Sequence, residues 1–197
     1  MDSQSPADIA ALEDGLSAAE HDARALIAGL SEDRGAWRAA PGSWSVAECL
    51  DHLATANRVY LGAMQDSAAA ALANGRARRR AAQPGLIGGW FVRALEPPVT
   101  RRFRMKAPRK IRPRTGPSLA DAAARFLDGQ EQVRGFLRRY AGVDLAGVRF
   151  PNPFIPGVRF SLATGLHVIV AHERRHLWQA WRVRRAAERT PPAGPET

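Results

Sequence analysis

Apolar residues recur at three- and four-residue steps in four separate stretches of the chain, and this spacing places them on one face of a helix. The stretches cover residues 8–30, 46–73, 119–140 and 160–185. No βαβ pattern of short apolar strands alternating with helices accompanies them. We therefore predict an all-α fold, a four-helix bundle in which the four apolar faces pack against one another.

The predicted ends of these helices rest on local signals. Ser45 and Glu48 have the spacing of a capping box, in which the serine accepts a hydrogen bond from the third amide and the glutamate reaches back. Ser118 is placed to cap the third helix in the same way. Residues 31–44 and 141–159 contain proline and glycine and are predicted to be loops.

The connection between the second and third predicted helices is long and is interrupted by prolines. It covers residues 76–117, and its prolines are Pro84, Pro97, Pro98, Pro108, Pro113 and Pro117. Connections of this length within a compact domain are typically functional or disordered. We expect one domain over residues 1–187, with residues 76–117 as a crossover and residues 188–197 as a disordered tail.

Composition places the chain among ordinary globular proteins. Its 197 residues are 45% hydrophobic, enough for a substantial core in a single domain. No apolar run approaches the 18 residues of a membrane span, and no secretory signal pattern opens the sequence. The single cysteine, Cys49, cannot form an internal disulfide. We expect a cytoplasmic protein without a membrane partner.

Positive charge is concentrated in one segment. Residues 75–117 carry 13 basic residues and one acidic residue, a local charge of +12, whereas the rest of the chain has a net charge of −2. Such a segment can bind an anionic cosubstrate or a nucleic acid. Few aromatic residues are interleaved with the arginines for base stacking, which argues against nucleic acid as the partner.

Two histidines on the last predicted helix are the clearest chemical signal. His172 and His176 are separated by about 40° of arc and about 6 Å of rise, so they point the same way. Both fall on the apolar face, near Val168 and Ala180. An unpaired buried polar group costs roughly 1–3 kcal/mol, and a shared metal ion would avoid that cost. Helical H-x-x-x-H pairs also occur often without a ligand, so a third metal ligand is needed to decide.

Four other residues are candidates for that third ligand. His21 lies between acidic residues of the first predicted helix and is expected to face solvent. His167 points about 140° away from His172. Cys49 lies on the apolar stripe of the second helix and is a weaker candidate. His52 lies on the flank of that stripe, where it can face a neighbouring helix, and it is the strongest of the four.

The two histidine-containing segments together resemble the DinB-like superfamily of bacterial proteins. The first reads WSVAECLDHL over residues 44–53, and the second reads HERRHLWQ over residues 172–179. The resemblance extends from the second predicted helix to the last. It implies a four-helix bundle in which His52, His172 and His176 bind a divalent metal ion, zinc or nickel.

The resemblance also implies an activity, because the superfamily includes metal-dependent transferases of thiols such as bacillithiol and mycothiol. We therefore expect transfer of a small thiol to an electrophilic substrate. Gln179 and Glu48 are candidates to hydrogen-bond the metal-binding histidines, with the capping box as the alternative role of Glu48. Hydrolysis of an amide or ester is the alternative reaction. The third hypothesis is a non-catalytic metal-binding protein that acts through interactions in a stress response.

The crossover contains an apolar stretch, residues 86–95, that is too hydrophobic to remain in solvent. We predict that it folds as a short helix against the bundle near the mouth of the metal cleft. There Trp90 and Phe91 would form part of a lid, and the crossover arginines would form a positive collar for an anionic substrate. The alternative is an apolar patch that fills a groove or forms the interface of a homodimer.

Overall fold

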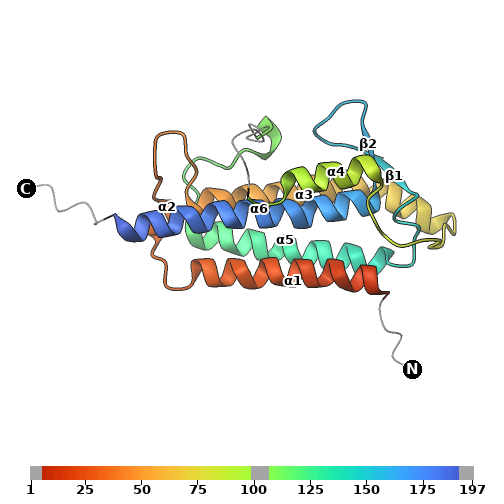
Figure 1. Ribbon diagram of the computed structural model, residues 1–197, viewed down its shortest axis with the longest axis horizontal. Coiled ribbons are helices and arrows are strands. Elements are labelled where there is room, and N and C mark those ends of the chain that lie inside the picture. Colours follow the sequence, from red (N-terminus) through yellow and green to blue (C-terminus); the bar gives the residue numbers. More distant parts are fainter. Residues whose placement is uncertain (1–5, 99–106, 191–197) are drawn as a thin grey trace, which may run out of the picture.

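Four long helices lie side by side and make up most of the protein (Figure 1). They are α1 (Ala7–Ile27), α3 (Val46–Ala73), α5 (Leu119–Tyr140) and α6 (Leu162–Arg189). The computed structural model describes residues 6–98 and 107–190, and all structural statements concern those residues. The chain is mostly helical, as predicted. Within the described ranges, none of the helices has the length and apolar character needed to cross a membrane.

The boundaries of α3 and α5 agree with the sequence prediction at both ends. The capping box at the start of α3 is present, with Ser45 accepting from the amide of Glu48 and Glu48 accepting from the amide of Ser45. Ser118 caps α5. α6 continues to Arg189, so the first two residues of the predicted tail are helical, whereas residues 191–197 lie outside the described part.

Two predicted loops contain regular structure. Residues 31–44 include the short helix α2 (Glu32–Ala36), which is capped by Ser31. Residues 141–159 lead into an antiparallel pair of strands, β1 (Arg149–Pro151) and β2 (Arg159–Ser161). Strands of three residues are too short to produce a recognisable alternating pattern.

The approach of α3 to α6 positions the candidate metal ligands. A methyl group added at Gly165 of α6 would lie 2.5 Å from the sulfur of Met64 on α3 and 2.9 Å from the ring of Phe150. Real Cβ atoms do not make such close contacts. Glycine at this position therefore allows the two helices to pack closely at one end of their shared interface.

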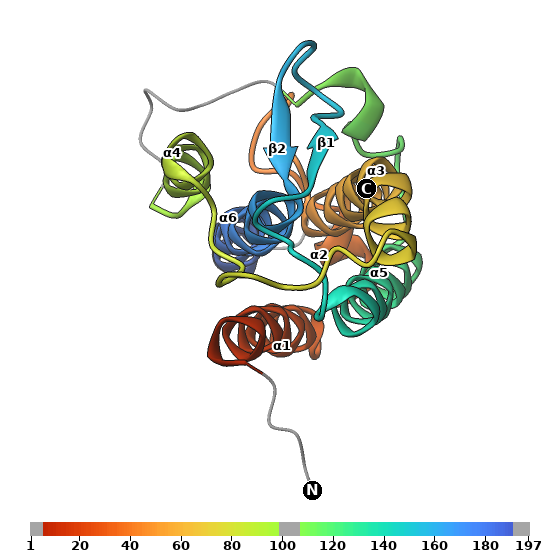
Figure 2. The same cartoon turned by 90° about the vertical axis from the view of Figure 1, so that its right-hand side faces the viewer.

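The crossover contributes a short helix on the outside of the four long ones. Helix α4 (Leu86–Leu95) confirms the predicted element and lies beside α6 in both views (Figures 1 and 2). Phe91 packs against Phe160, with ring centroids 5.3 Å apart, and Leu95 is buried. A 3-10 turn, η2 (Arg109–Ile111), follows later in the crossover.

The opposite face of α4 is exposed. Leu86, Ile87 and Trp90 retain 97%, 79% and 65% of their accessible surface, so these side chains do not fill a groove. The homodimer interface suggested for this segment remains a prediction.

Candidate metal centre

Three imidazoles from two helices converge at one point. His52 of α3 meets His172 and His176 of α6, and one nitrogen of each lies within 4.8 Å of the others. The Nε2 atoms of His52 and His172 are 3.2 Å apart. The structure thus brings together the three histidines named from the sequence.

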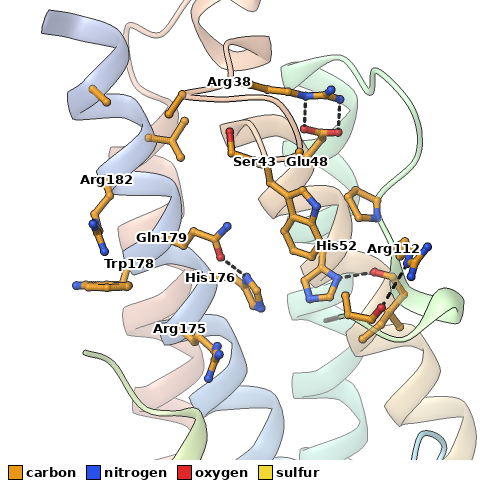
Figure 3. A pocket seen from close by; sticks show the side chains of 18 of the residues that line it. Arg38, Ser43, Glu48, His52, Arg112, Arg175, His176, Trp178, Gln179 and Arg182 are labelled. Carbon is orange, nitrogen blue, oxygen red and sulfur yellow. Dashed lines mark hydrogen bonds and ion pairs between the residues drawn. The ribbon is translucent and has the colours of Figure 1, made fainter. Parts of the chain in front are cut away.

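The orientation of His52 is set by the crossover. Its Nδ1 lies 2.5 Å from the carbonyl oxygen of Ile111, so Nδ1 carries the proton and donates it (Figure 3). Asp51 fixes this part of the crossover, because its buried carboxylate accepts from the amide and the guanidinium of Arg114, both at 2.8 Å. The Nε2 of His52 is left with a free lone pair that faces the other two histidines.

The other side of the cluster has a similar arrangement. The Nδ1 of His176 lies 3.1 Å from Oε1 of Gln179, three residues further along α6 (Figure 3). The ring of Trp44 lies against the cluster, with its centroid 4.7 Å from that of His52 and 5.6 Å from that of His176. Hydrogen bonds of this kind to the outer nitrogen are typical of histidines that bind metals.

Burial keeps all three imidazoles neutral at neutral pH. It lowers the pKa of His52 to about 4. It also lowers the pKa of His172 and His176 well below the ordinary value, and repulsion from neighbouring imidazoles and from Arg175 adds to the effect. Neutral imidazoles are the form that binds metal ions. Because two rings present unprotonated nitrogens to a common point, the donor set fits a divalent metal ion.

The cluster lies at the base of an open cleft of about 1160 Å³. The wall contains seven arginines, namely Arg38, Arg112, Arg114, Arg175, Arg182, Arg185 and Arg189. Two of them, Arg112 and Arg114, belong to the crossover, as the predicted positive collar requires. The others come from α6 and from the loop before α3. Crossover residues 99–106, with four more basic side chains, lie outside the described part.

A sequence comparison with known families gives a match over residues 16–180, to the family described as the DinB superfamily. The chain belongs to the DinB superfamily. Neither a curated protein nor a solved structure matches it.

The lid predicted for this DinB superfamily protein is wrong in its main residues. Trp90 and Phe91 are not among the residues that line the cleft, and Leu95 is the residue of α4 that does. Phe91 instead contacts Phe160 of β2, which lies before the start of α6 at Leu162, whereas His172 is ten residues into that helix, about 15 Å along it. α4 therefore borders the cleft with its last turn and does not cover it.

Glu48 does not contact the histidines. Both of its carboxylate oxygens accept from Arg38, at 2.6 and 2.9 Å, and one also completes the capping box (Figure 3). Glu48 therefore serves in the capping box, the alternative role predicted for it.

The remaining sequence candidates lie outside the cluster. His21 is exposed. His167 lies 3.0 Å from the carbonyl oxygen of Ala82 and is bound to the crossover. Cys49 is fully buried among apolar side chains, and this burial raises the pKa of its thiol.

The burial of one residue next to His172 in the sequence of this DinB superfamily protein was not anticipated. Glu173 lies between the two α6 histidines in sequence, yet its side chain is fully buried and accepts a 2.7 Å hydrogen bond from Asn57. Burial raises the pKa of Glu173 to about 7. The angle of about 100° between consecutive helical residues, which turns Glu173 away from His172, was the available signal.

Proposed function

We propose that this protein is a metal-dependent transferase that joins a small thiol to an electrophilic substrate at His52, His172 and His176. The observation that carries the proposal is the convergence of three neutral imidazoles at the base of an open cleft. The scaffold that we infer is a four-helix bundle of α1, α3, α5 and α6 with a long crossover. Zinc and nickel both suit three imidazole ligands.

Three protein ligands leave at least one coordination position for a small molecule, as in catalytic sites. When bound, such a metal ion lowers the pKa of a thiol or a water and makes it a nucleophile at neutral pH. The protein's own residues orient the ligands: Ile111 and Gln179 hold the outer nitrogens of His52 and His176. Trp44 covers one side of the cluster and excludes water from it.

The position of Glu173 favours thiol transfer over hydrolysis. Residues 172–176 read H-E-x-x-H, the spacing of zinc metalloproteases, in which the glutamate acts as the general base for water. Here Glu173 is fully buried, is bonded to Asn57 and does not line the cleft. Glu48 is the one carboxylate among the described lining residues, and Arg38 and the capping box occupy it. A thiol needs less help from a base than water does, because its pKa is much lower.

The proposal is tested in two stages on protein prepared without an affinity tag. Elemental analysis should find about one zinc or nickel ion per chain, and His172→Gln should remove it while His21→Gln retains it. A screen of small thiols against electrophiles should then show conjugation that depends on His172 and on the metal.

The alternative functions predict different results from the same experiment. Hydrolysis of amides or esters without thiol conjugation would support the hydrolase. One metal ion per chain with neither activity would support the non-catalytic metal-binding protein.

A further inference from the structure

The wall of the cleft contains an arginine stripe whose members recur at seven-residue intervals on α6. Arg175, Arg182 and Arg189 all line the cleft, and Arg185 lines it beside them. Seven residues correspond to two helical turns, about 10.5 Å, with a drift of about 20°. The stripe therefore runs along the wall from the histidines to the outer end of the cleft.

The outer part of this stripe differs in its charge balance from Arg38 and Arg114, which line the cleft on its other side. Arg38 is paired with Glu48 at 2.6 Å, and Arg114 with Asp51 at 2.8 Å. Within residues 6–98 and 107–190, no carboxylate lies within ion-pair distance of the outer three, which are Arg182, Arg185 and Arg189. Their charge faces the cleft without a protein counterion from that part of the chain.

The side chain of Arg182 is also held in place by a neighbouring aromatic ring before any ligand binds. Its guanidinium carbon lies 4.8 Å from the centre of the Trp178 ring, and the two side chains stack at the edge of the cleft (Figure 3). A stacked guanidinium keeps its hydrogen-bond donors for a ligand and loses little conformational freedom on binding one. Several unbalanced positive charges in one cleft attract anions and raise their local concentration.

The distance between the stripe and the histidines indicates how long a ligand must be to contact both. Arg182 follows His176 by six residues and Arg185 follows it by nine, which correspond to about 9 and 14 Å along α6. We infer that the cleft binds an elongated ligand whose reacting end reaches the histidines and whose anionic end, a phosphate or carboxylate group, is held by Arg182, Arg185 and Arg189. The reacting end rests on the proposed function, whereas the anionic end does not.

Calorimetry with linear thiols on the metal-loaded protein tests the contacts proposed for both ends of the ligand. The probes are ω-mercaptoalkyl phosphonates of increasing chain length, the matching carboxylates and neutral thiols of the same length. We expect the anionic group to tighten binding roughly tenfold or more once the probe spans about 10 Å, because charge-assisted hydrogen bonds from a guanidinium are stronger than neutral ones. The phosphonate and carboxylate series show which anion the stripe prefers.

The double variant Arg182→Gln/Arg185→Gln should abolish that gain and leave the binding of neutral thiols unchanged. Its matched control is Arg79→Gln/Arg139→Gln, which removes the same charge from exposed positions outside the cleft; Arg139 also stacks on an aromatic ring, that of Tyr140. The control should retain the gain. Equal affinity for anionic and neutral probes at every length, or an equal loss in both double variants, would overturn the inference.

Two further measurements separate this inference from the proposed function. Inorganic pyrophosphate should bind the metal-free protein and lose affinity in Arg182→Gln/Arg185→Gln, even if no thiol binds. Single-stranded DNA should compete weakly. If DNA binds more tightly than every anionic thiol and depends on the same two arginines, the stripe is a nucleic-acid contact and the inference is wrong.

Discussion

Two buried polar clusters lie on the same pair of helices and have opposite surroundings. His52 and Asn57 are five residues apart on α3, and His172 and Glu173 are neighbours on α6. The histidines converge at the base of the cleft, whereas Asn57 and Glu173 bond to each other inside the protein. The two clusters therefore differ in where the partners of their buried polar atoms come from.

In the core cluster, the polar partner comes from the protein itself. Asn57 donates to one oxygen of Glu173, and the second oxygen has no partner among the described residues, which fits a carboxyl group that is protonated easily. In the cleft cluster, His52 and His176 use their Nδ1–H groups to donate hydrogen bonds to the carbonyl oxygen of Ile111 and to Oε1 of Gln179. Their inner nitrogens are acceptors that face one another, and a metal cation satisfies them together.

Replacement of a cleft histidine tests most directly whether the cleft cluster binds a metal ion. Replacing His52, His172 or His176 by glutamine should weaken metal binding by more than about 100-fold, since even the loss of a residue that only orients a ligand costs 10–100-fold. The unfolding free energy of the metal-free protein should change little. Competition with a chromogenic chelator measures the affinity. Retention of tight binding by any of the three variants contradicts the assignment of that residue.

The opposite pattern is expected in the core cluster. Glu173→Ala should lower the unfolding free energy of the metal-free protein by about 2–4 kcal/mol, because it leaves a cavity and an orphaned Asn57. Metal affinity should stay within about threefold of the original. Urea denaturation and the same chelator assay test this. Loss of metal at unchanged stability would mean that Glu173 belongs to the cleft site.

Titration of Glu173 should give the stability of the protein a specific pH dependence. Its pKa is raised from 4.5 to about 7 on folding, so the folded state holds the proton more tightly and the stabilisation is complete only below the unfolded value. Between pH 5 and 7.5 the metal-free wild type should therefore lose about 2 kcal/mol relative to Glu173→Gln. Taking the difference between the two proteins cancels the histidines, which titrate in both. A pH-independent difference would show that the carboxyl group does not titrate in this range.

The smallest effect is expected from the outer hydrogen bond of the cleft cluster. Gln179→Ala removes the acceptor of His176 Nδ1 and should weaken metal binding by roughly tenfold. Gln132→Ala is the matched control, because Gln132 is exposed on α5 and donates a hydrogen bond to Asp128. If both variants bind metal equally well, Gln179 does not orient His176.

Local signals were enough to predict much of this molecule from its sequence. The capping box marks the start of α3, because its chemistry is contained within a few residues. The three histidines could be grouped because two share a helix face, the third lies on the flank of another helix, and both segments resemble those of the DinB-like superfamily. α4 was found from its apolar composition, which is also local.

Features that depend on how distant segments meet were not predictable in this way. The carbonyl of Ile111 reaches His52 across 59 residues, and a backbone acceptor has no sequence signature. The direction of Trp90 depends on which side of α4 meets α6, and both sides are apolar enough for either outcome. The arginine stripe of α6 does have a sequence signal, the seven-residue spacing that begins beside the histidines, although most of the net positive charge of the sequence lies in the crossover.

X-ray absorption at the metal edge of the untagged protein tests the central claim most directly. The account predicts a first shell with three imidazole nitrogens at about 2.0–2.1 Å, together with the outer-shell scattering of the rings and one or more light atoms. His52→Gln should reduce the imidazole count to two. A protein without bound metal, a shell with sulfur from Cys49, or a shell unchanged by His52→Gln would contradict the three-histidine centre.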